Sequence, residues 1–326
     1  MKIILSGNLN PYYNLAAEEV LLKNKPDDYI VLWRSKPCVV VGKHQNAWAE
    51  TNFEYLQKNN IDLARRLSGG GTVYHDQGNV NFTFIMNGEE GNLVDFKRFT
   101  LPVIHFLEKL GLHTTFGGHN SLLYNGLKFS GNAEHVFKRR VLHHGTILFN
   151  ADLGKLHEVI NTPFQQYTDK AVKSVRASVT NLQPLLKGVS GIEDFIDKMV
   201  VFFHDYFQDI EKYQYTEEEE ARVKSLANDK YRTWEWNYGY SPKYTLNRTF
   251  SYNGIPVSFK LEVKRGVIEK LTFQGEEAPD PLLQKIMEEF PGNQHRYGKL
   301  LEIVRKPGWI RLSSKENLGD VLLKLF

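Results

Sequence analysis

The amino-acid sequence predicts an α+β protein with one large domain and one small C-terminal domain. Strand-like and helix-like segments follow one another without the regular strand–helix alternation of a doubly wound sheet. Asn-Gly pairs at 125–126 and 253–254 lie between β-prone residues, which is a strong signal for a hairpin. After Ser241-Pro242 a compact run of three strands is followed by helices. We therefore expect domains at 1–242 and 243–326, both within the usual size range.

Apolar spacing and flanking turn residues predict the individual elements. Asn14 is expected to cap a helix, and Gly111 to end another. A Ser-Lys-Pro turn between two β-rich runs predicts a hairpin of strands 29–34 and 38–42. The expected helices are 15–23, 53–60, 99–110, 192–207, 216–228, 281–289 and 318–326. The other expected strands are 79–86, 121–124, 127–130, 145–150, 244–252, 255–263 and 267–273.

Length and composition exclude several classes of protein. The chain has 326 residues, 41% of them apolar, which suffices for a sizeable core. Its formal net charge of +3 is too close to zero to indicate nucleic-acid binding. Cys38 is the one cysteine, so no intrachain disulfide forms, and no apolar run approaches the roughly 18 residues of a membrane span. We expect a cytoplasmic protein that binds neither nucleic acid nor membrane.

The most informative segment runs from Arg65 to Asp76 and reads Arg-Arg-Leu-Ser-Gly-Gly-Gly-Thr-Val-Tyr-His-Asp. Three consecutive glycines let the backbone approach a ligand closely, and their bare N–H groups can form an anion-binding nest. The adjacent arginines offer planar donor forks suited to carboxylate or phosphate. The spacing matches neither a Walker A loop nor the dinucleotide-binding fingerprint. The segment therefore predicts a site for an anionic small molecule such as a nucleotide.

Four further residues are candidates for chemistry. Lys128 follows the 125–126 turn and can stabilise a transferring acyl or phosphoryl oxygen, although a lysine at a strand end is more often a surface residue. Adjacent His143 and His144 point to opposite faces of a strand, so they do not hold one metal ion together. Cys38 precedes three valines, and burial there would raise its pKa and make the thiol unreactive.

Several segments, taken in order, resemble the lipoate–protein ligase A family of the biotin/lipoate protein ligase superfamily. The glycine segment continues through Gly78-Asn79, and the other matching segments are Lys128 to Ala133, His143 to Thr146, Ser174 to Leu182 and Trp234 to Gly239. The resemblance implies a large mixed-sheet catalytic domain of the biotin/lipoate ligase type and a small α/β accessory domain.

The resemblance also implies a reaction in two steps. Lipoate and ATP, with Mg²⁺ as the activating ion, would give lipoyl-AMP and pyrophosphate. The lipoyl group would then pass to a lysine of an apo lipoyl domain in a 2-oxoacid dehydrogenase E2 subunit, or of the glycine cleavage H protein. Family members suggest a monomer.

Residue roles follow from the same resemblance. Lys128 would be the catalytic residue, beside the lipoyl carbonyl oxygen and the α-phosphate. The residues that would bind ATP and the adenylate are Arg66, Gly71, Thr72, Val73, Tyr74, Asn79 and Lys128. The residues that would bind lipoate are Trp33, Arg66, Ser68, Gly69, Gly70, Lys128 and His144. No metal ligand is assigned.

One departure from the family leaves alternatives open. Family members commonly carry Gly-Arg-Asn-Asp where this chain has Gly118 to Ser121, so His119 and Ser121 replace an arginine and an aspartate. The missing carboxylate bears on metal handling, and Asp76 or Glu134 are candidate replacements. The alternatives to a ligase are an octanoyl or lipoyl acyltransferase, a catalytically impaired lipoate- or nucleotide-binding homologue, and a biotin ligase. An acyltransferase needs a thiolate nucleophile, and Cys38 is the only thiol.

Overall fold

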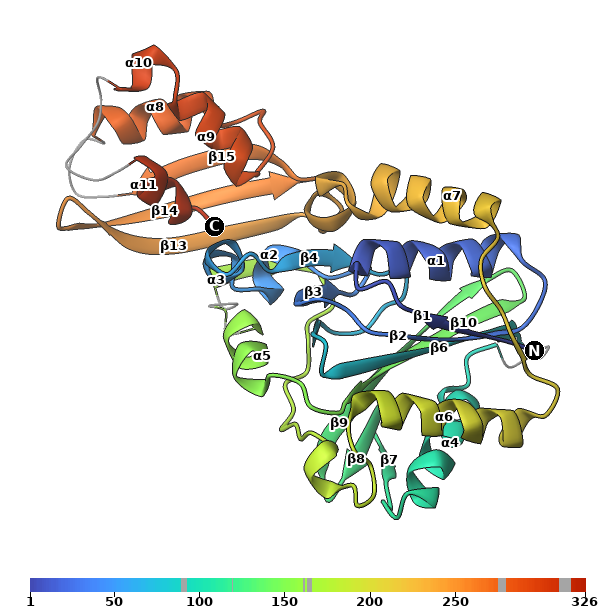
Figure 1. Ribbon diagram of the computed structural model, residues 1–326. Coiled ribbons are helices and arrows are strands. Elements are labelled where there is room, and N and C mark those ends of the chain that lie inside the picture. The colour runs from blue at the N-terminus through green and yellow to red at the C-terminus, as the bar shows by residue number, and fades with distance from the viewer. Residues whose placement is uncertain (89–92, 119, 161, 163–165, 275–279, 311–317) are drawn as a thin grey trace. The chain divides into compact units, whose positions relative to one another are not determined.

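The computed structural model describes residues 1–326 except 89–92, 119, 161, 163–165, 275–279 and 311–317 (Figure 1). The chain divides into two compact units, each made of three segments. The N-terminal unit comprises Met1–Lys43, Ile61–His157 and Ser174–Thr233, and the C-terminal unit comprises His44–Asn60, Glu158–Lys173 and Trp234–Phe326. The expected domain boundary at 242/243 stays a prediction, because a division into compact units does not test which part of the chain folds independently. No helix in the described part is long and apolar enough to cross a membrane.

An eight-stranded mixed sheet forms the centre of the N-terminal unit, in the order β12-β1-β2-β6-β10-β9-β8-β7. β1 runs parallel to β12 and β2, and the remaining neighbours are antiparallel. A smaller sheet has the order β4-β3-β5. The strands are β1 (Lys2–Ser6), β2 (Tyr29–Trp33), β3 (Cys38–Val41), β4 (Asp62–Arg65), β5 (Val73–His75), β6 (Asn79–Asn87), β7 (Thr115–Gly117), β8 (Ser121–Tyr124), β9 (Leu127–Phe137), β10 (Arg140–Leu148) and β12 (Glu211–Lys212).

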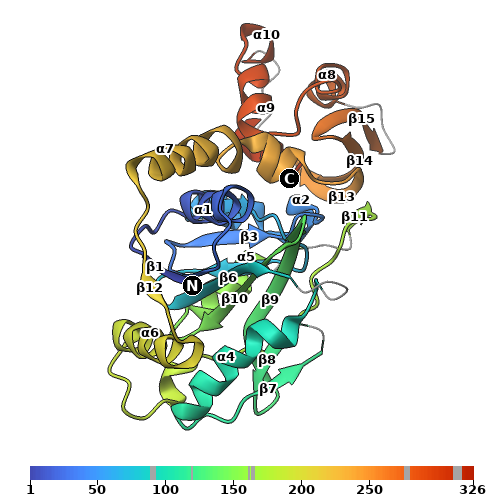
Figure 2. The ribbon, with the colours of Figure 1, turned by 90° about the vertical axis from the view of Figure 1, so that its right-hand side faces the viewer.

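Helices cover both faces of the eight-stranded sheet, with α1 along one face and α4 and α6 along the other (Figure 1, Figure 2). The helices are α1 (Pro11–Asn24), α4 (Phe96–Lys109), α6 (Ile192–Phe207) and α7 (Glu217–Leu226), with short segments Gln183–Leu185 and Ala227–Tyr231. Helix α5 (Leu153–Ile160) contributes residues to both units.

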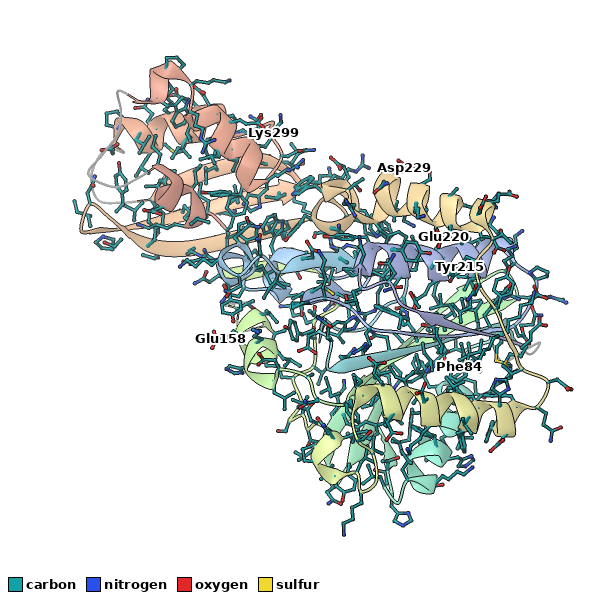
Figure 3. The ribbon with its side chains drawn as sticks, viewed as in Figure 1. Phe84, Glu158, Tyr215, Glu220, Asp229 and Lys299 are labelled. Atoms are coloured by element: carbon teal, nitrogen blue, oxygen red, sulfur yellow. The ribbon has the colours of Figure 1, made fainter. Side chains whose placement is uncertain are left out.

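Strand β6 separates two kinds of environment by simple alternation. Its residues 80, 82 and 84 are Val, Phe and Phe, all fully buried in the core formed with α4 and α6. Phe84 lies between β6 and α6, with its ring 5.8 Å from that of Phe203 (Figure 3). Its residues 79, 81 and 83 are Asn, Asn and Thr, also buried, and Thr83 bonds to Glu18 of α1. The α1 face of the sheet is therefore lined by polar groups.

The C-terminal unit contains a four-stranded antiparallel sheet in the order β11-β13-β14-β15. Aromatic residues from distant segments share its core, where Trp48, His295 and Phe326 have ring centroids within about 5 Å of one another. Its elements are α2 (Ala47–Glu50), α3 (Phe53–Lys58), β11 (Tyr167–Asp169), the π-helical segment Glu235–Gly239, β13 (Tyr244–Tyr252), β14 (Ile255–Lys264), β15 (Val267–Gln274), α8 (Pro281–Glu289), α9 (Tyr297–Val304), α10 (Pro307–Ile310) and α11 (Leu318–Leu323).

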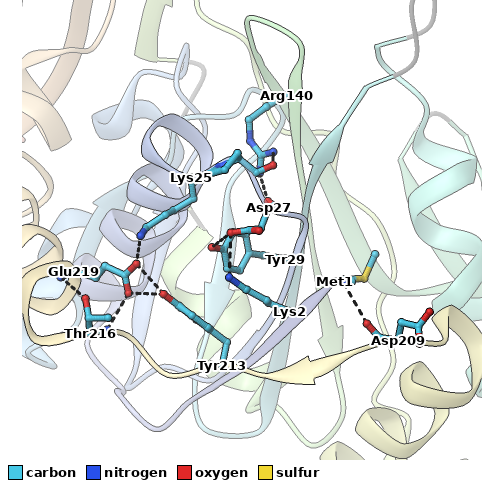
Figure 4. Close-up of polar contacts among 11 residues, drawn as sticks. Met1, Lys2, Lys25, Asp27, Tyr29, Arg140, Asp209, Tyr213, Thr216 and Glu219 are labelled. Carbon is cyan, nitrogen blue, oxygen red and sulfur yellow. Dashed lines mark hydrogen bonds and ion pairs between the residues drawn. The ribbon is translucent and has the colours of Figure 1, made fainter.

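A polar network joins the first strand to the segment before α7 (Figure 4). Lys2 Nζ lies 3.1 Å from Asp27 Oδ2, and the Tyr213 hydroxyl donates to Glu219 at 2.8 Å. Lys25 forms an ion pair with the same glutamate. Pairs of this kind, near the surface, contribute up to about 1 kcal/mol each. The network therefore helps to hold the sheet edge without indicating a ligand site.

The expected hairpin of strands 29–34 and 38–42 is wrong. β2 pairs with β1 and β6, whereas β3 pairs with β4 and β5, so the two strands belong to different sheets. The expected cap at Asn14 is also wrong, because Asn10 caps α1 and Pro11 begins it. Both Asn-Gly hairpins are confirmed: Asn125 and Asn253 have φ of 48° and 50°, and each is followed by a glycine with positive φ.

Candidate active site

On the α1 face of the eight-stranded sheet, a row of residues crosses five neighbouring strands. Trp33 of β2 is paired with Asn81 of β6, which is paired with Thr146 of β10. The Gly131 N–H of β9 donates to Thr146 Oγ1 at 3.3 Å, and Gly131 is paired with Ser121 of β8. Directly opposite residues in antiparallel strands present their side chains to the same face. This Trp33–Ser121 row therefore runs from an indole at one end to a hydroxyl at the other.

Lys128 lies near the Ser121 end of the row. A Cβ at Gly131 would lie 3.2 Å from Lys128 Cε and 3.3 Å from Nζ, so glycine leaves room for the lysine side chain. The Lys128 N–H donates to Ser178 O at 2.9 Å, and its carbonyl accepts from the Thr180 N–H at 3.0 Å. Burial, and then the charge of Arg66, lowers the pKa of Lys128. Its ammonium group forms no hydrogen bond or ion pair with any residue that the structure describes.

The Arg66 side chain holds the glycine loop, residues 68–72. Its Nε donates to Ser68 Oγ at 2.9 Å, and Nη2 donates to the carbonyls of Gly69 and Gly71 at 2.7 and 2.6 Å. Its Nη1 donates to Val40 O at 3.1 Å. Burial lowers the pKa of Arg66 to about 10, which leaves the guanidinium charged at neutral pH. Arg66 therefore fixes the loop conformation and brings a positive charge toward Lys128.

Two glycines allow the loop to take this path. Gly70 has a φ of +83°, which residues with a Cβ rarely adopt. A Cβ at Gly42 would lie 2.2 Å from Gly70 O, a clash with backbone that no side-chain rotation relieves. The Thr72 N–H donates to Ser174 Oγ at 2.8 Å. Segment Ser174–Thr180 thus contacts both the glycine loop and Lys128, so three segments distant in sequence meet here.

A hydrogen-bonded chain runs beneath the loop to helix α1. Ser68 Oγ lies 2.6 Å from His144 Nε2, His144 Nδ1 lies 3.0 Å from Glu18 Oε2, and Thr83 Oγ1 donates to Glu18 Oε1 at 2.6 Å. A carboxylate only accepts, so His144 Nδ1 carries a proton and donates it to Glu18. Ser68 Oγ accepts from Arg66 Nε, and its own proton can be donated to His144 Nε2. The chain fixes the loop, the histidine tautomer and α1 together.

Replacing Ser68 by alanine is expected to lower the free energy of unfolding by about 1–3 kcal/mol. Ser68 is fully buried, and its loss would leave both Arg66 Nε and His144 Nε2 without their partner. Urea denaturation of both proteins measures the change. The matched control is Ser251→Ala, because Ser251 is exposed. Equal urea midpoints for the Ser68 and Ser251 variants would contradict the proposed role of the hydrogen-bonded chain.

Several buried polar atoms on this face have no protein partner in the described part of the chain. They are both ring nitrogens of His75, Asn79 Oδ1 and Asn81 Nδ2. Burial, aided by Arg66 and His144, lowers the pKa of His75 to about 3, so the ring is neutral. The His75 ring lies 5.5 Å from that of Trp33. Leaving such atoms unpaired costs about 1–3 kcal/mol each, so their grouping indicates bound water or ligand.

The other predicted residues lie in and around this site. Val73 and Tyr74 are in β5 and pair with β3, and the Tyr74 side chain is 1% exposed, which leaves backbone as its contact with any ligand. His143 and His144 point to opposite faces, as predicted: His143 Nδ1 lies 2.8 Å from Glu134 Oε1. The sequence patterns did not indicate Glu18 or Thr83, and they singled out His75 without giving it a role. The visible signal for Glu18 was a carboxylate next to the small and apolar residues Ala16, Ala17 and Val20 of its helix.

The two acids suggested as replacements for the missing aspartate are already engaged. Asp76 accepts from the N–H groups of Gly78 and Asp152 at 2.9 and 2.8 Å, and Glu134 bonds to His143. Ser121 presents its hydroxyl beside Gly131. His119 lies outside the described residues. Among those described, no three or more His, Cys, Asp or Glu side chains are grouped as metal ligands.

Comparison with known proteins agrees with this geometry. Residues 10–204 match the family model "Lipoyl protein ligase A/B catalytic domain". The chain is 38% identical over 280 residues to lipoate–protein ligase 1 of Staphylococcus aureus, covering 85% of each chain.

Two similar solved structures are lipoate protein ligases. One is a lipoate–protein ligase A bound with ATP, 26% identical with a TM-score of 0.63, covering 73% of this chain and 98% of that one. The other is a bipartite lipoate protein ligase studied with its E2 lipoyl domain, from Thermoplasma acidophilum, 26% identical with a TM-score of 0.65, covering 73% of this chain and 96% of that one. The predicted α+β class with a large mixed sheet is confirmed. This chain therefore belongs to the lipoyl protein ligase A/B catalytic domain family.

Proposed function

We propose that this protein is an ATP-dependent lipoate–protein ligase. It activates lipoate as lipoyl-AMP and then transfers the lipoyl group to a lysine amine. One observation carries the proposal: the partly buried Lys128 ammonium lacks a protein partner in the described part of the chain and lies near a second cation, Arg66. Two neighbouring buried cations are stabilised by an anion between them, and the carboxylate and α-phosphate of this reaction supply that charge.

The proposed chemistry places charge at Lys128 in both steps. In the first, a lipoate carboxylate oxygen attacks the α-phosphorus of ATP, a C–O–P anhydride forms and pyrophosphate leaves. In the second, the acceptor amine releases a proton to solvent and attacks the lipoyl carbonyl, an amide forms with loss of the second amine proton, and the bond to AMP breaks so that AMP leaves. Negative charge develops on the carbonyl and phosphoryl oxygens each time, and the Lys128 ammonium stabilises it. We assign the nucleotide to Arg66, Asn79 and the backbone of residues 71–74.

The lipoyl chain is proposed to extend along the Trp33–Ser121 row. Neighbouring strands are about 4.8 Å apart, so the three steps from β9 to β2 span roughly 14 Å. That distance accommodates an extended eight-carbon acid with its carboxyl at Lys128 and its dithiolane at the Trp33 indole. Ser68, Gly69 and Gly70 of the glycine loop would contact the lipoyl chain, and His144 would lie beside it.

Mg²⁺ does not fit a protein-held site in the described residues, because no group of acidic ligands gathers there. We propose that it arrives on the ATP phosphates, since Mg²⁺ keeps several waters and commonly binds through substrate phosphates. As acceptors we propose the lipoyl domains of 2-oxoacid dehydrogenase E2 subunits and the glycine cleavage H protein. We also propose that the protein is a cytoplasmic monomer.

The test is a reaction of purified protein with lipoate, ATP and an apo lipoyl domain. We expect pyrophosphate release that requires lipoate, and a mass increase of the domain that requires ATP. Lipoyl transfer from a lipoylated protein without ATP would overturn the proposal in favour of the acyltransferase. Replacement of lipoate by biotin in the same assay distinguishes a biotin ligase.

Cys38 gives a separate test against the acyltransferase. The thiol is fully buried, and burial raises its pKa to about 12, so the thiolate needed for attack is not formed at neutral pH. We expect Cys38→Ala to retain lipoyl transfer within about twofold of the wild type, as for an inert buried thiol. We also expect iodoacetamide to modify Cys38 only after denaturation. Loss of transfer in a variant with an unchanged melting curve would support the thiol mechanism.

A further inference from the structure

Four basic side chains gather on the N-terminal unit, and the reaction proposed above uses none of them. They are called the basic cluster here: Lys23, Lys43, His135 and Lys230. Lys23 and Lys230 both bind Glu19 of α1, with Nζ–O distances of 2.6 and 2.7 Å. Lys23 Nζ also lies 5.4 Å from the ring centroid of Phe137, which shares a face of β9 with His135. These contacts place the cluster between α1 and the far end of β9.

Lys43 links the basic cluster to the glycine loop. Its N–H donates to Ser68 O at 2.8 Å, and its carbonyl accepts from Arg65 Nη1 at 3.1 Å. The backbone of residue 43 is therefore fixed on both sides. Lys43 is half-buried, and its ammonium group forms no hydrogen bond or ion pair with a described residue. The anchored backbone sets the region that the Lys43 side chain can reach.

The charges of the cluster act on one another. Burial, followed by the charges of Lys43 and Lys23, lowers the pKa of His135. Burial also lowers the pKa of Lys230; Glu19 opposes this effect, while Lys23 and Lys43 add to it. Lys23 and Lys230 share the one carboxylate of Glu19, and Lys43 forms no ion pair with a described residue, so the three lysines exceed this carboxylate by two positive charges. An anionic partner would relieve their repulsion.

The basic cluster lies at a distance from the reacting centre that a docked acceptor domain can span. His135 and Gly131 share one face of β9, four residues or roughly 13 Å apart. The Lys128 ammonium lies at Gly131, so a carboxylate on the cluster would be about that far from the reacting carbonyl. Acids near a target lysine on an acceptor surface can reach the cluster while that lysine enters the site. The nucleotide, in contrast, is placed at the glycine loop and Lys128.

We infer that the basic cluster is the docking surface for carboxylates that flank the target lysine of the acceptor domain. The inference rests on the proposed function and adds where the acceptor is recognised. A protonated acceptor lysine approaches two cations, Arg66 and Lys128, and like charges repel it. Attraction between the flanking carboxylates and the basic cluster offsets that repulsion and orients the domain. Such contacts act mainly on association rate and its salt dependence.

The experiment separates the two half-reactions in full-length protein. Pyrophosphate release from lipoate and ATP is measured without acceptor, and transfer from preformed lipoyl-AMP is measured against concentration of an apo lipoyl domain. Lys43→Glu is expected to raise the acceptor KM on the order of tenfold and to flatten its salt dependence. Pyrophosphate release is expected to stay within about twofold, because no side-chain contact with the nucleotide is removed. Lys43→Gln, which adds no charge, should show a smaller KM change in the same direction.

Two controls make the outcomes decisive. Lys97→Glu reverses the charge of an exposed lysine on α4, at the opposite face of the sheet, and should leave the acceptor KM unchanged. A lipoyl domain whose carboxylates beside the target lysine are changed to amides should lose the preference for the wild type over Lys43→Glu. An unchanged acceptor KM in Lys43→Glu, or a rise in the KM for ATP, would overturn the docking surface. Absence of pyrophosphate release from the wild type would instead reject the proposed function.

Discussion

Replacement of Lys128 by alanine is expected to lower kcat/KM for lipoyl-AMP formation by roughly 100- to 1000-fold, the usual effect of losing one electrostatic contact to a transition state. The charge is partly buried, lies near Arg66 and has no protein partner in the described part of the chain, so it is available to the reacting oxygens. Its removal leaves no buried group unpaired. Because folding lowers the pKa of Lys128, its charged form is disfavoured in the native state, and the variant should not lose stability. Lipoate-dependent pyrophosphate release and thermal melting measure the two effects.

Two comparisons support the interpretation of that result. Lys97→Ala removes an exposed lysine and should leave both rate and melting temperature near wild-type values. The wild-type rate should fall with rising pH at a value below the usual pKa range of lysine, because the Lys128 ammonium then loses its proton. A Lys128→Ala protein that forms lipoyl-AMP at the wild-type rate would remove this residue from the mechanism.

Replacement of Gly42 by alanine should produce the second large effect, on the order of 100-fold in kcat/KM for ATP, as expected for a small displacement of a binding element. The added Cβ would lie 2.2 Å from Gly70 O, and no rotamer change relieves a contact with backbone. The glycine loop must then shift away from its bonds with Arg66, which changes where its N–H groups point. Overpacking of this kind also lowers the free energy of unfolding by about 1–3 kcal/mol. Steady-state kinetics and urea denaturation check both parts.

Gly7→Ala is the matched control for that substitution. A Cβ at Gly7 meets no atom within 4 Å, and its φ lies outside the left-handed region. Its free energy of unfolding should stay within about 1 kcal/mol of the wild type. If Gly42→Ala matched this control in both kinetics and stability, the close approach of Gly42 to Gly70 would have no functional consequence.

Local signals predicted the parts of the fold that depend on local geometry. The Asn125-Gly126 and Asn253-Gly254 turns require positive φ at both residues, so their hairpins could be predicted from the sequence. Strands β2 and β3 are different, because every residue in both is buried. Their composition predicts two strands but carries no information on which neighbours they choose. The pairing of β2 with β6 and of β3 with β4 depends on residues elsewhere in the sequence. The short turn between β2 and β3 led to the wrong prediction of a hairpin.

The candidate site likewise contains residues that the sequence indicated and residues that it did not. The glycine loop stood out because three consecutive glycines follow two arginines, whereas Lys128 received its catalytic role from the family resemblance. The strand that begins at Leu127 was expected to span 127–130, yet β9 continues through Gly131 to Phe137. That glycine is where the Lys128 side chain lies. Glu18 and His75 could not be assigned roles, because their partners become visible only when α1 and β5 are placed against the sheet.

Because apolar and polar residues alternate along β6, this strand tolerates a change in its length less well than a change in its residue types. A single residue inserted or deleted between Asn79 and Phe84 would slip the register and exchange the two faces. Asparagine and threonine would enter the aromatic core, and phenylalanine rings would take the places beneath the glycine loop. Substitutions in β6 therefore have graded effects, whereas a change in its length by one residue abolishes core and site together.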